Sequence, residues 1–307
     1  MTTPRAILEP DRPYLTDGGL ETTLVFHDEI DLPDFAAFPL LDTPEGRSTL
    51  QRYFAPYLEI ARRDGATFVI DTPTWRANPD WAARLGYDRA ALARVNVAAV
   101  DFVRSLAAAA RVDHLVDGVI GPRGDGYAVG EAMSAEESAS YHSLQARAFA
   151  EAGAGFITAV TMTNVEEAIG ICEAGARVGL PVCISFTVET DGRLPSGTSL
   201  AEAIALVDAS PNPPAHYMVN CAHPSHFEHV LDDGAWRDRI KAVRANASRM
   251  SHVELDNAEE LDAGDPEELA TDYVRLGTLL PGLQLVGGCC GTDHRHIDRI
   301  SATLVPC

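Results

Sequence analysis

A series of short apolar runs, separated by helical patterns, restricts the fold of this sequence more than any other feature. Such runs, bounded by glycine, proline or polar residues, are typical of strands that are buried on both faces of a parallel sheet. The sequence contains eight of them. We therefore expect strands at 14–16, 67–72, 114–122, 156–161, 181–188, 216–221, 241–246 and 284–288.

Helical patterns lie between most of the expected strands. Apolar residues at helical spacing predict helices over 47–63, 80–86 and 89–110. Capping signals begin further helices at Ser134, Asn164, Ser199 and Asp265, and a last helix is expected over about 293–304. An alternation of strand and helix indicates a parallel sheet with right-handed crossovers.

Eight such units close into a barrel, so we expect the α/β class and a single (β/α)8 TIM barrel. The length of 307 residues suits that fold, which averages roughly 250 residues and grows with insertions. An open, doubly wound sheet is the alternative. Its nucleotide-binding fingerprint is incomplete here, because Gly18 and Gly19 have no third glycine at the required offset. With no interior linker, residues 1–307 are interpreted as one domain.

Polar residues and cysteines gather where the expected strands end. Barrel enzymes carry their chemistry at the C-terminal ends of the strands. The residues at these ends are Asp17, Thr72, Thr161, Cys221, Cys289 and Cys290. Because the ends of a closed barrel face one rim, Cys221 can meet Cys289 and Cys290 although about 70 residues separate them.

The run Gly287-Gly288-Cys289-Cys290-Gly291 is unusual for a core. Thiolates are soft ligands that suit zinc, and three of them leave one tetrahedral position open. We therefore predict that Cys221, Cys289 and Cys290 bind Zn²⁺. Two other interpretations stay open at this point: small residues packed at a strand end, and a redox pair, although adjacent cysteines form only a strained disulfide ring.

Composition limits the partners and the compartment. A net charge of −21 repels nucleic acid and anionic membranes. No apolar run reaches the roughly 18 residues of a membrane span, and residues 1–5 do not begin a signal peptide. Six cysteines without an export signal indicate a reducing cytoplasm and no disulfide framework. We expect a cytoplasmic protein with small-molecule partners, and a homo-oligomer stays open.

Two further patterns have plainer interpretations. His223 and His226 follow Cys221 closely and could complete a zinc shell, but we expect them to cap the next helix or face water. The acidic segment from Glu254 to Glu268 is expected to be a solvated surface.

Three motifs together resemble the homocysteine S-methyltransferase family. They are Asp-Gly-Gly-Leu-Glu-Thr-Thr-Leu at 17–24, Asn220-Cys221, and Gly-Gly-Cys-Cys-Gly-Thr at 287–292. The likeness extends over most of the chain, through Thr-Pro-Thr-Trp-Arg-Ala at 72–77 and Gly121-Pro122. It implies a homocysteine-binding barrel domain in which Cys221, Cys289 and Cys290 hold zinc.

The resemblance also implies the reaction. The thiol of homocysteine would take the open zinc position and accept a methyl group from a small onium donor, such as S-methylmethionine or a betaine, giving methionine. Coordination to zinc deprotonates a thiol, and a cationic donor departs neutral, so no catalytic residue apart from the metal ligands is expected. Asp17, Gly18 and Thr72 are implied as substrate contacts.

One position departs from the family. Val160 stands where the family carries the glutamate that is expected to hold the amino group of homocysteine. Either Asp17 or Asp71 serves that ammonium, or the acceptor is a different thiol. A non-catalytic zinc-binding barrel, with a shell closed by a fourth protein ligand such as His223, is the remaining alternative.

Overall fold

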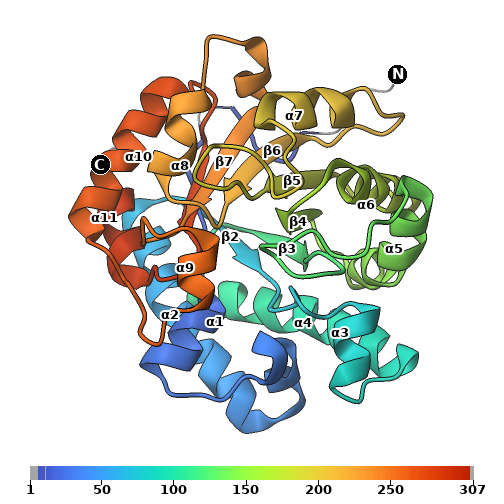
Figure 1. The fold of residues 1–307 in the computed structure, drawn as a ribbon. Helices are drawn as coiled ribbons and strands as arrows, with labels where there is room; N and C mark the ends of the chain where they lie inside the picture. The colour runs from blue at the N-terminus through green and yellow to red at the C-terminus, as the bar shows by residue number, and fades with distance from the viewer. Residues whose placement is uncertain (1–5, 11, 305–307) are drawn as a thin grey trace.

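The computed structural model describes residues 6–10 and 12–304 and confirms the closed barrel (Figure 1). Its parallel strands pair in chain order, and the last pairs with the first, so the open sheet is wrong. The strands are β1 (Tyr14–Leu15), β2 (Thr67–Asp71), β3 (His114–Ile120), β4 (Phe156–Met162), β5 (Val182–Phe186), β6 (His216–Asn220), β7 (Ile240–Ala245) and β8 (Leu285–Gly288).

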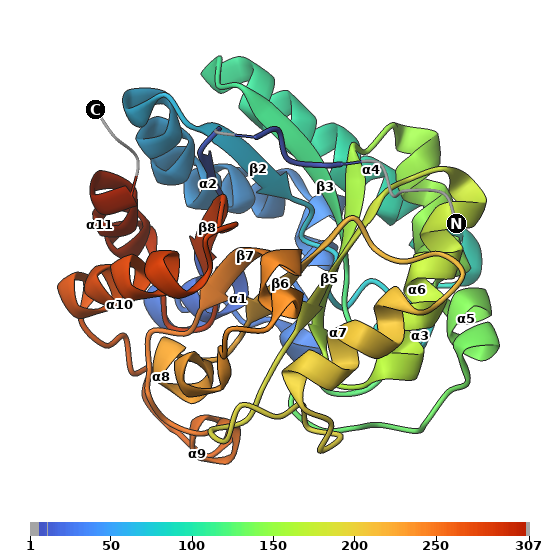
Figure 2. The ribbon, with the colours of Figure 1, turned by 90° about the horizontal axis from the view of Figure 1, so that it is seen from above.

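Helices surround the strands in Figure 1. The longer ones are α2 (Pro44–Asp64), α3 (Pro79–Arg84), α4 (Arg89–Ala110), α5 (Ala135–Ala152), α6 (Val165–Val178), α7 (Leu200–Asp208), α10 (Pro266–Leu279) and α11 (His294–Leu304). Short helices are α1 (Leu20–Thr22), α8 (Pro224–Phe227) and α9 (His252–Asp256), and single turns cover Thr23–His27, Pro33–Phe35, Phe38–Asp42, Glu228–Val230 and Ala235–Arg239. Figure 2 shows α8 and α9 at the same end of the barrel.

The helix starts follow their capping residues, as predicted. Ser134 accepts a hydrogen bond from the backbone N–H of Glu137, whose side chain accepts one in return. Asn164 caps α6 in the same way without the return bond. Asp265 accepts from two backbone N–H groups at the start of α10. These side chains accept hydrogen bonds from backbone N–H groups that a helix start leaves without a partner. The residues at each start therefore predicted where the helix begins.

Two apolar clusters form the core. The larger one lies between the strands and the surrounding helices. The smaller one draws at least one residue from every strand, as expected for side chains that fill a barrel interior. Its members are Leu8, Tyr14, Val69, Val119, Phe156, Val160, Cys183, Met218, Ala242 and Leu285. The interior is therefore packed, and chemistry is confined to the rim.

Two expectations about the whole chain have different outcomes. No helix among the described residues is long and apolar enough to cross a membrane. Residues 1–5, used above to argue about a signal peptide, lie outside the described residues, and the single domain over 1–307 stays a prediction.

His216, at the start of β6, provides a test of the packed interior. It is 4% exposed, its Nε2 has no hydrogen-bond partner, and burial lowers its pKa to about 3, with Arg239 and Lys241 adding to the effect. A histidine whose folded pKa is depressed stabilises the fold above its unfolded pKa, and that stability is lost as pH falls. When the pH is lowered from about 7 to about 5, the free energy of unfolding of the wild type should therefore fall by about 2 kcal/mol more than that of His216→Gln.

Urea unfolding at the two pH values measures this difference. His229→Gln is the matched control, because His229 is exposed. An identical loss in the wild type and in His216→Gln would contradict a buried neutral imidazole.

Candidate active site

A cavity of about 450 Å³ opens at the C-terminal ends of the strands. It is lined by residues within β2, β3, β4 and β7 and by residues of the loops that follow β1, β2, β3, β6, β7 and β8. The predicted site residues Asp17, Gly18, Thr72, Cys221, Cys289 and Cys290 all line it. The expectation that these positions share one rim is confirmed, while the role of each residue stays a prediction.

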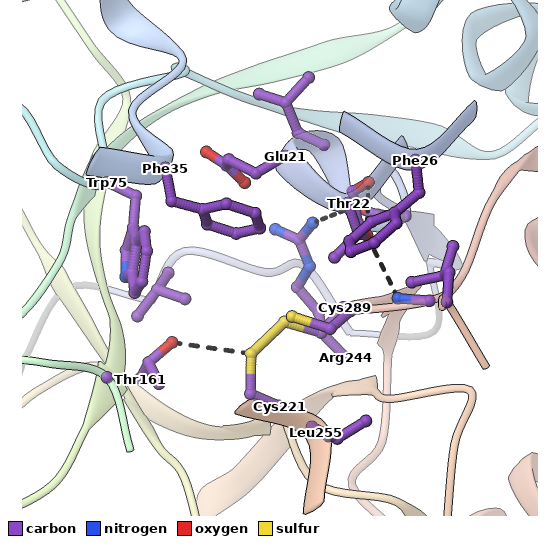
Figure 3. A pocket seen from close by; sticks show the side chains of 18 of the residues that line it. Glu21, Thr22, Phe26, Phe35, Trp75, Thr161, Cys221, Arg244, Leu255 and Cys289 are labelled. Carbon is purple, nitrogen blue, oxygen red and sulfur yellow. Dashed lines mark hydrogen bonds between the residues drawn. A yellow bond between two sulfur atoms is a disulfide. The ribbon is translucent and has the colours of Figure 1, made fainter. Parts of the chain in front are cut away.

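The three cysteines form one cluster. Their Sγ atoms lie within 4.8 Å of one another, and Cys221 is buried while Cys289 and Cys290 are half-buried. Cys221 and Cys289 are joined as a disulfide, with their Cα atoms 5.4 Å apart (Figure 3). The composition argued against a disulfide framework, and Cys172, Cys183 and Cys290 are free, but this one pair is bonded. The bond joins two strand ends and not the adjacent cysteines.

The local backbone brings the two cysteine segments together. Cys221 has a φ of 52° and Gly291 a φ of 79°, so both segments turn in the left-handed region directly at the cluster. The Cys289 N–H donates to the Ala245 carbonyl (2.8 Å), and the Ala247 N–H donates to the Cys290 carbonyl (3.1 Å). The turn that carries Cys289 and Cys290 is thus fixed to the end of β7, next to β6.

Each sulfur has a donor beside it. The contacts are Thr161 Oγ1 to Cys221 (3.8 Å), Asn220 Nδ2 to Cys289 (3.8 Å) and the Tyr127 hydroxyl to Cys290 (3.5 Å). Donors to sulfur favour the thiolate form, as the outer partners of metal ligands generally do. Burial, by contrast, raises the pKa of the Cys290 thiol. Once the Cys221–Cys289 bond is reduced, thiolates at this depth need a cation, and the three soft sulfurs fit a zinc-like ion.

His223 does not close the cluster. Its Nδ1 accepts a hydrogen bond from the backbone N–H of Ser225 (3.2 Å), and its Nε2 lies 3.4 Å from Asp272. The expected capping role is confirmed for His223, but neither it nor His226 faces water, because both are buried. Among the described residues, the metal-competent group consists of the three cysteines only.

Arg244, on β7, holds two of the pocket's carboxylates. Its Nη2 lies 2.5 Å from Asp17 Oδ1, its Nη1 pairs with Asp71, and its Nε donates to the Gly288 carbonyl (2.9 Å). Asp17 Oδ2 also accepts a hydrogen bond from the Tyr53 hydroxyl (2.9 Å). Arg244 therefore already pairs with both acids that the sequence analysis named as possible partners of a substrate ammonium.

Thr72 is also engaged within the protein. Its hydroxyl accepts a hydrogen bond from the Val119 N–H (2.9 Å) and shares another with the Thr74 hydroxyl (2.7 Å). Thr72 thus joins the ends of β2 and β3 while it forms part of the pocket wall. Gly18 lies close to Tyr57 and Thr292, and a Cβ on it would come within 2.7 Å of the Thr292 carbonyl oxygen.

Sequence reasoning missed several residues of the pocket. Glu21 belongs to the first motif but was not singled out, and Arg244 was a charge within a strand expected to be buried, which was an available signal. The acidic segment from Glu254 to Glu268 is not only a solvated surface, because Leu255, Leu261 and Asp262 line the cavity. The apolar residues between the acids were the signal that part of this segment packs over a cavity.

Burial raises the pKa of Glu21 to about 7. The nearby Asp17 carboxylate adds to this effect. The backbone N–H of Glu21 lowers the pKa, and so do the charges of Arg244 and Arg76. Asp17, by contrast, accepts a hydrogen bond on each of its carboxylate oxygens, from Tyr53 and from Arg244.

The fold and the site define a (β/α)8 barrel with a cysteine cluster at the rim that can hold a metal. A model of the homocysteine S-methyltransferase family matches residues 14–304. The chain belongs to this family and is a methyltransferase that acts on small molecules.

Individual relatives agree with this assignment. Homocysteine S-methyltransferase 1 of Arabidopsis thaliana is 25% identical over 316 residues, which cover 94% of this chain and 93% of the relative. Methionine synthase of Mycobacterium leprae (strain TN) is 32% identical over 139 residues, covering 44% of this chain and 11% of that protein. The metallated form of the homocysteine methyltransferase MmuM from Escherichia coli matches with a TM-score of 0.75 over 97% of this chain and 98% of that chain; at 23% identity this likeness shows the fold.

The Arg244 network yields a stability prediction. Arg244→Leu leaves Asp17 and Asp71 buried without their cation, so it should destabilise the barrel by about 3–5 kcal/mol. The control Arg249→Leu removes an arginine whose side chain is 56% exposed, where ion pairs contribute at most about 1 kcal/mol. Thermal unfolding measures both variants. Equal melting temperatures would show that Arg244 does not hold the two acids.

Proposed function

We propose that this protein is a zinc-dependent S-methyltransferase that moves a methyl group from a small onium donor to the thiol of homocysteine, giving methionine. The proposal rests chiefly on one observation: sulfurs from the ends of β6 and β8 lie within 4.8 Å of one another in the wall of the pocket. Donors of the S-methylmethionine or betaine type fit this chemistry, because attack on the methyl group of an onium centre releases a neutral sulfide or amine. We place the reaction in the cytoplasm.

The protein's own part in the reaction is to bind and to orient. When bound, zinc would lower the pKa of the acceptor thiol, so that the attacking sulfur is a thiolate. Cys221, Cys289 and Cys290 would hold the ion, and the donors beside their sulfurs would stabilise the thiolate form. The leaving amine or sulfide departs neutral, so no separate acid or base is required. Alignment of thiolate and methyl group is then the main contribution to the rate.

We propose that Asp17, Gly18 and Thr72 form the part of the wall that the substrate touches. Because the Asp17 carboxylate and the Thr72 hydroxyl already have partners, their contribution is to hold Arg244 and the ends of β2 and β3 in place. The tight approach of Gly18 to Thr292 leaves only backbone to face a substrate at that point.

A second candidate keeps the chemistry and changes the acceptor. Val160 is buried, lines the cavity and offers no charge to an ammonium. Arg244 occupies Asp17 and Asp71. Both observations favour an acceptor thiol other than homocysteine. A non-catalytic zinc barrel is disfavoured, because no fourth His, Cys, Asp or Glu among the described residues joins the cluster.

Metal binding is the first test. Reduced wild-type protein, loaded with zinc and dialysed, should retain about one zinc per chain, because three thiolates bind it. Cys289→Ala and Cys290→Ala should each retain far less and lose methyl transfer, while their circular dichroism stays that of a folded barrel. Cys172→Ala is the matched control, since Cys172 is a buried cysteine outside the cluster. Full zinc in either site variant would refute the ligand set.

An acceptor screen is the second test. Zinc-loaded enzyme is incubated with S-methylmethionine or a betaine and with a series of thiols, and methylated products are quantified by mass spectrometry. The proposal expects methionine from homocysteine, at a rate that Cys290→Ala abolishes. Methylation of homocysteine no faster than the uncatalysed reaction, beside faster methylation of another thiol, would select the second candidate.

A further inference from the structure

Glu21 lines the same cavity as the cysteine cluster. It belongs to α1, where the Thr22 hydroxyl accepts a hydrogen bond from the Gly291 N–H (3.2 Å). A Cβ on Gly19 would come within 3.1 Å of the Cys289 carbonyl carbon, so α1 and the cysteine turn touch through backbone. The side chain of Glu21 lines the cavity, and Figure 3 draws it among the other residues of the pocket. The backbone that carries Glu21 is therefore fixed relative to the turn that carries Cys289.

The other acids in the pocket are ion-paired, hydrogen-bonded or exposed. Asp17 and Asp71 pair with Arg244, Asp125 lies 3.5 Å from Arg76, and Asp262 accepts a hydrogen bond from the Ser248 hydroxyl. Asp256 and Glu260 are exposed at the rim. Glu21 is half-buried and, within the described part of the chain, has no basic nitrogen within 4.0 Å. Among the acids of this pocket that are not exposed, it is the one for which no ion pair is found in the described part of the chain.

A carboxylate taken out of water without a cation costs free energy, and the pKa of about 7 reflects that cost. A protein retains such a group where a ligand supplies the missing charge. Arg244 and Arg76 act on Glu21 from beyond ion-pair distance, and their effect on its pKa does not offset that of burial.

Aromatic rings complete the same wall. Phe26, Phe35 and Trp75 line the cavity together with Glu21. Phe35 has a φ of 55°, a left-handed conformation that a bulky residue rarely adopts and that is retained mainly at functional sites. Ring faces attract organic cations, including those that have no N–H to donate. A carboxylate among rings suits a cationic substrate better than a neutral or anionic one.

We infer that Glu21 is the residue that holds the positively charged group of a bound substrate beside the cysteine cluster. The cation is an alkylammonium or onium centre, and it has two sources within the proposed function, on which this inference rests: the ammonium of an amino-acid thiol and the onium centre of the methyl donor. In the first case, Glu21 binds the substrate ammonium, which the uncharged side chain of Val160 cannot do.

Direct binding tests the inference without turnover. Isothermal titration of zinc-loaded wild type and Glu21→Gln uses four ligands: homocysteine, 4-mercaptobutanoate, S-methylmethionine and glycine betaine. 4-Mercaptobutanoate has the thiol and carboxylate of homocysteine without the ammonium. Loss of a charged contact should weaken binding of the cationic ligand by about tenfold or more. Binding of 4-mercaptobutanoate should change by less than about twofold.

The pattern of losses identifies the source of the cation. Weaker binding of homocysteine alone assigns Glu21 to the acceptor ammonium, and weaker binding of S-methylmethionine or betaine assigns it to the donor. Unchanged binding of every ligand overturns the inference, and so does a wild type that binds none of the cations. A wild type that binds a cation through Glu21 but transfers no methyl group removes the proposed function and leaves this inference standing.

Two controls exclude a structural role. Glu151→Gln makes the same charge change at an exposed position on α5 and should bind all ligands as the wild type does. Glu21→Gln should keep its zinc and melt at the same or a higher temperature, because an amide does not bear the cost of a desolvated charge. A clearly lower melting temperature together with loss of zinc would assign Glu21 to the structure and not to a ligand.

Discussion

Closure of the barrel is the constraint on which the site depends. Cys221 and Cys289 are separated by 68 residues and belong to strands that are not neighbours. They meet because β7 lies between β6 and β8 and the rim curves, so that the loops after both strands turn toward one cavity. The backbone of Ala245 and Ala247 fastens the cysteine turn to that rim. Closure, through the pairing of β8 with β1, brings Asp17 to the same rim as the cysteines.

The rim also carries an internal charge balance. Arg244 is buried with Asp17 and Asp71, and burial raises the pKa of Asp71 to about 6 while Arg244 opposes that shift most strongly. Because Arg244 also donates to the Gly288 carbonyl, the strand end that precedes the cysteines is held by the same side chain that neutralises the acids. Charge balance and metal-site geometry are thus coupled through one arginine.

Sequence patterns predicted the strands and most helices closely, because burial of a strand and capping of a helix are recorded in neighbouring residues. Ser134 and Asn164 show this for α5 and α6. The cysteine cluster was predicted because strand ends converge in any closed barrel. The partners of each acid were not predictable in this way. Arg244 reaches Asp17 across 227 positions, and which carboxylate it neutralises depends on side-chain geometry inside the rim.

That geometry decides what the pocket can recognise. The sequence offered Asp17 or Asp71 as the partner of a substrate ammonium, and Arg244 pairs with both. The wall also carries an apolar Val160, the rings of Phe35 and Trp75, and the carboxylate of Glu21. The proposed contact of Glu21 would hold a substrate cation from the side of α1. Since α1 rests on the cysteine turn through Thr22 and Gly291, any charge bound there is fixed in distance from the attacking sulfur, which is the alignment that methyl transfer requires.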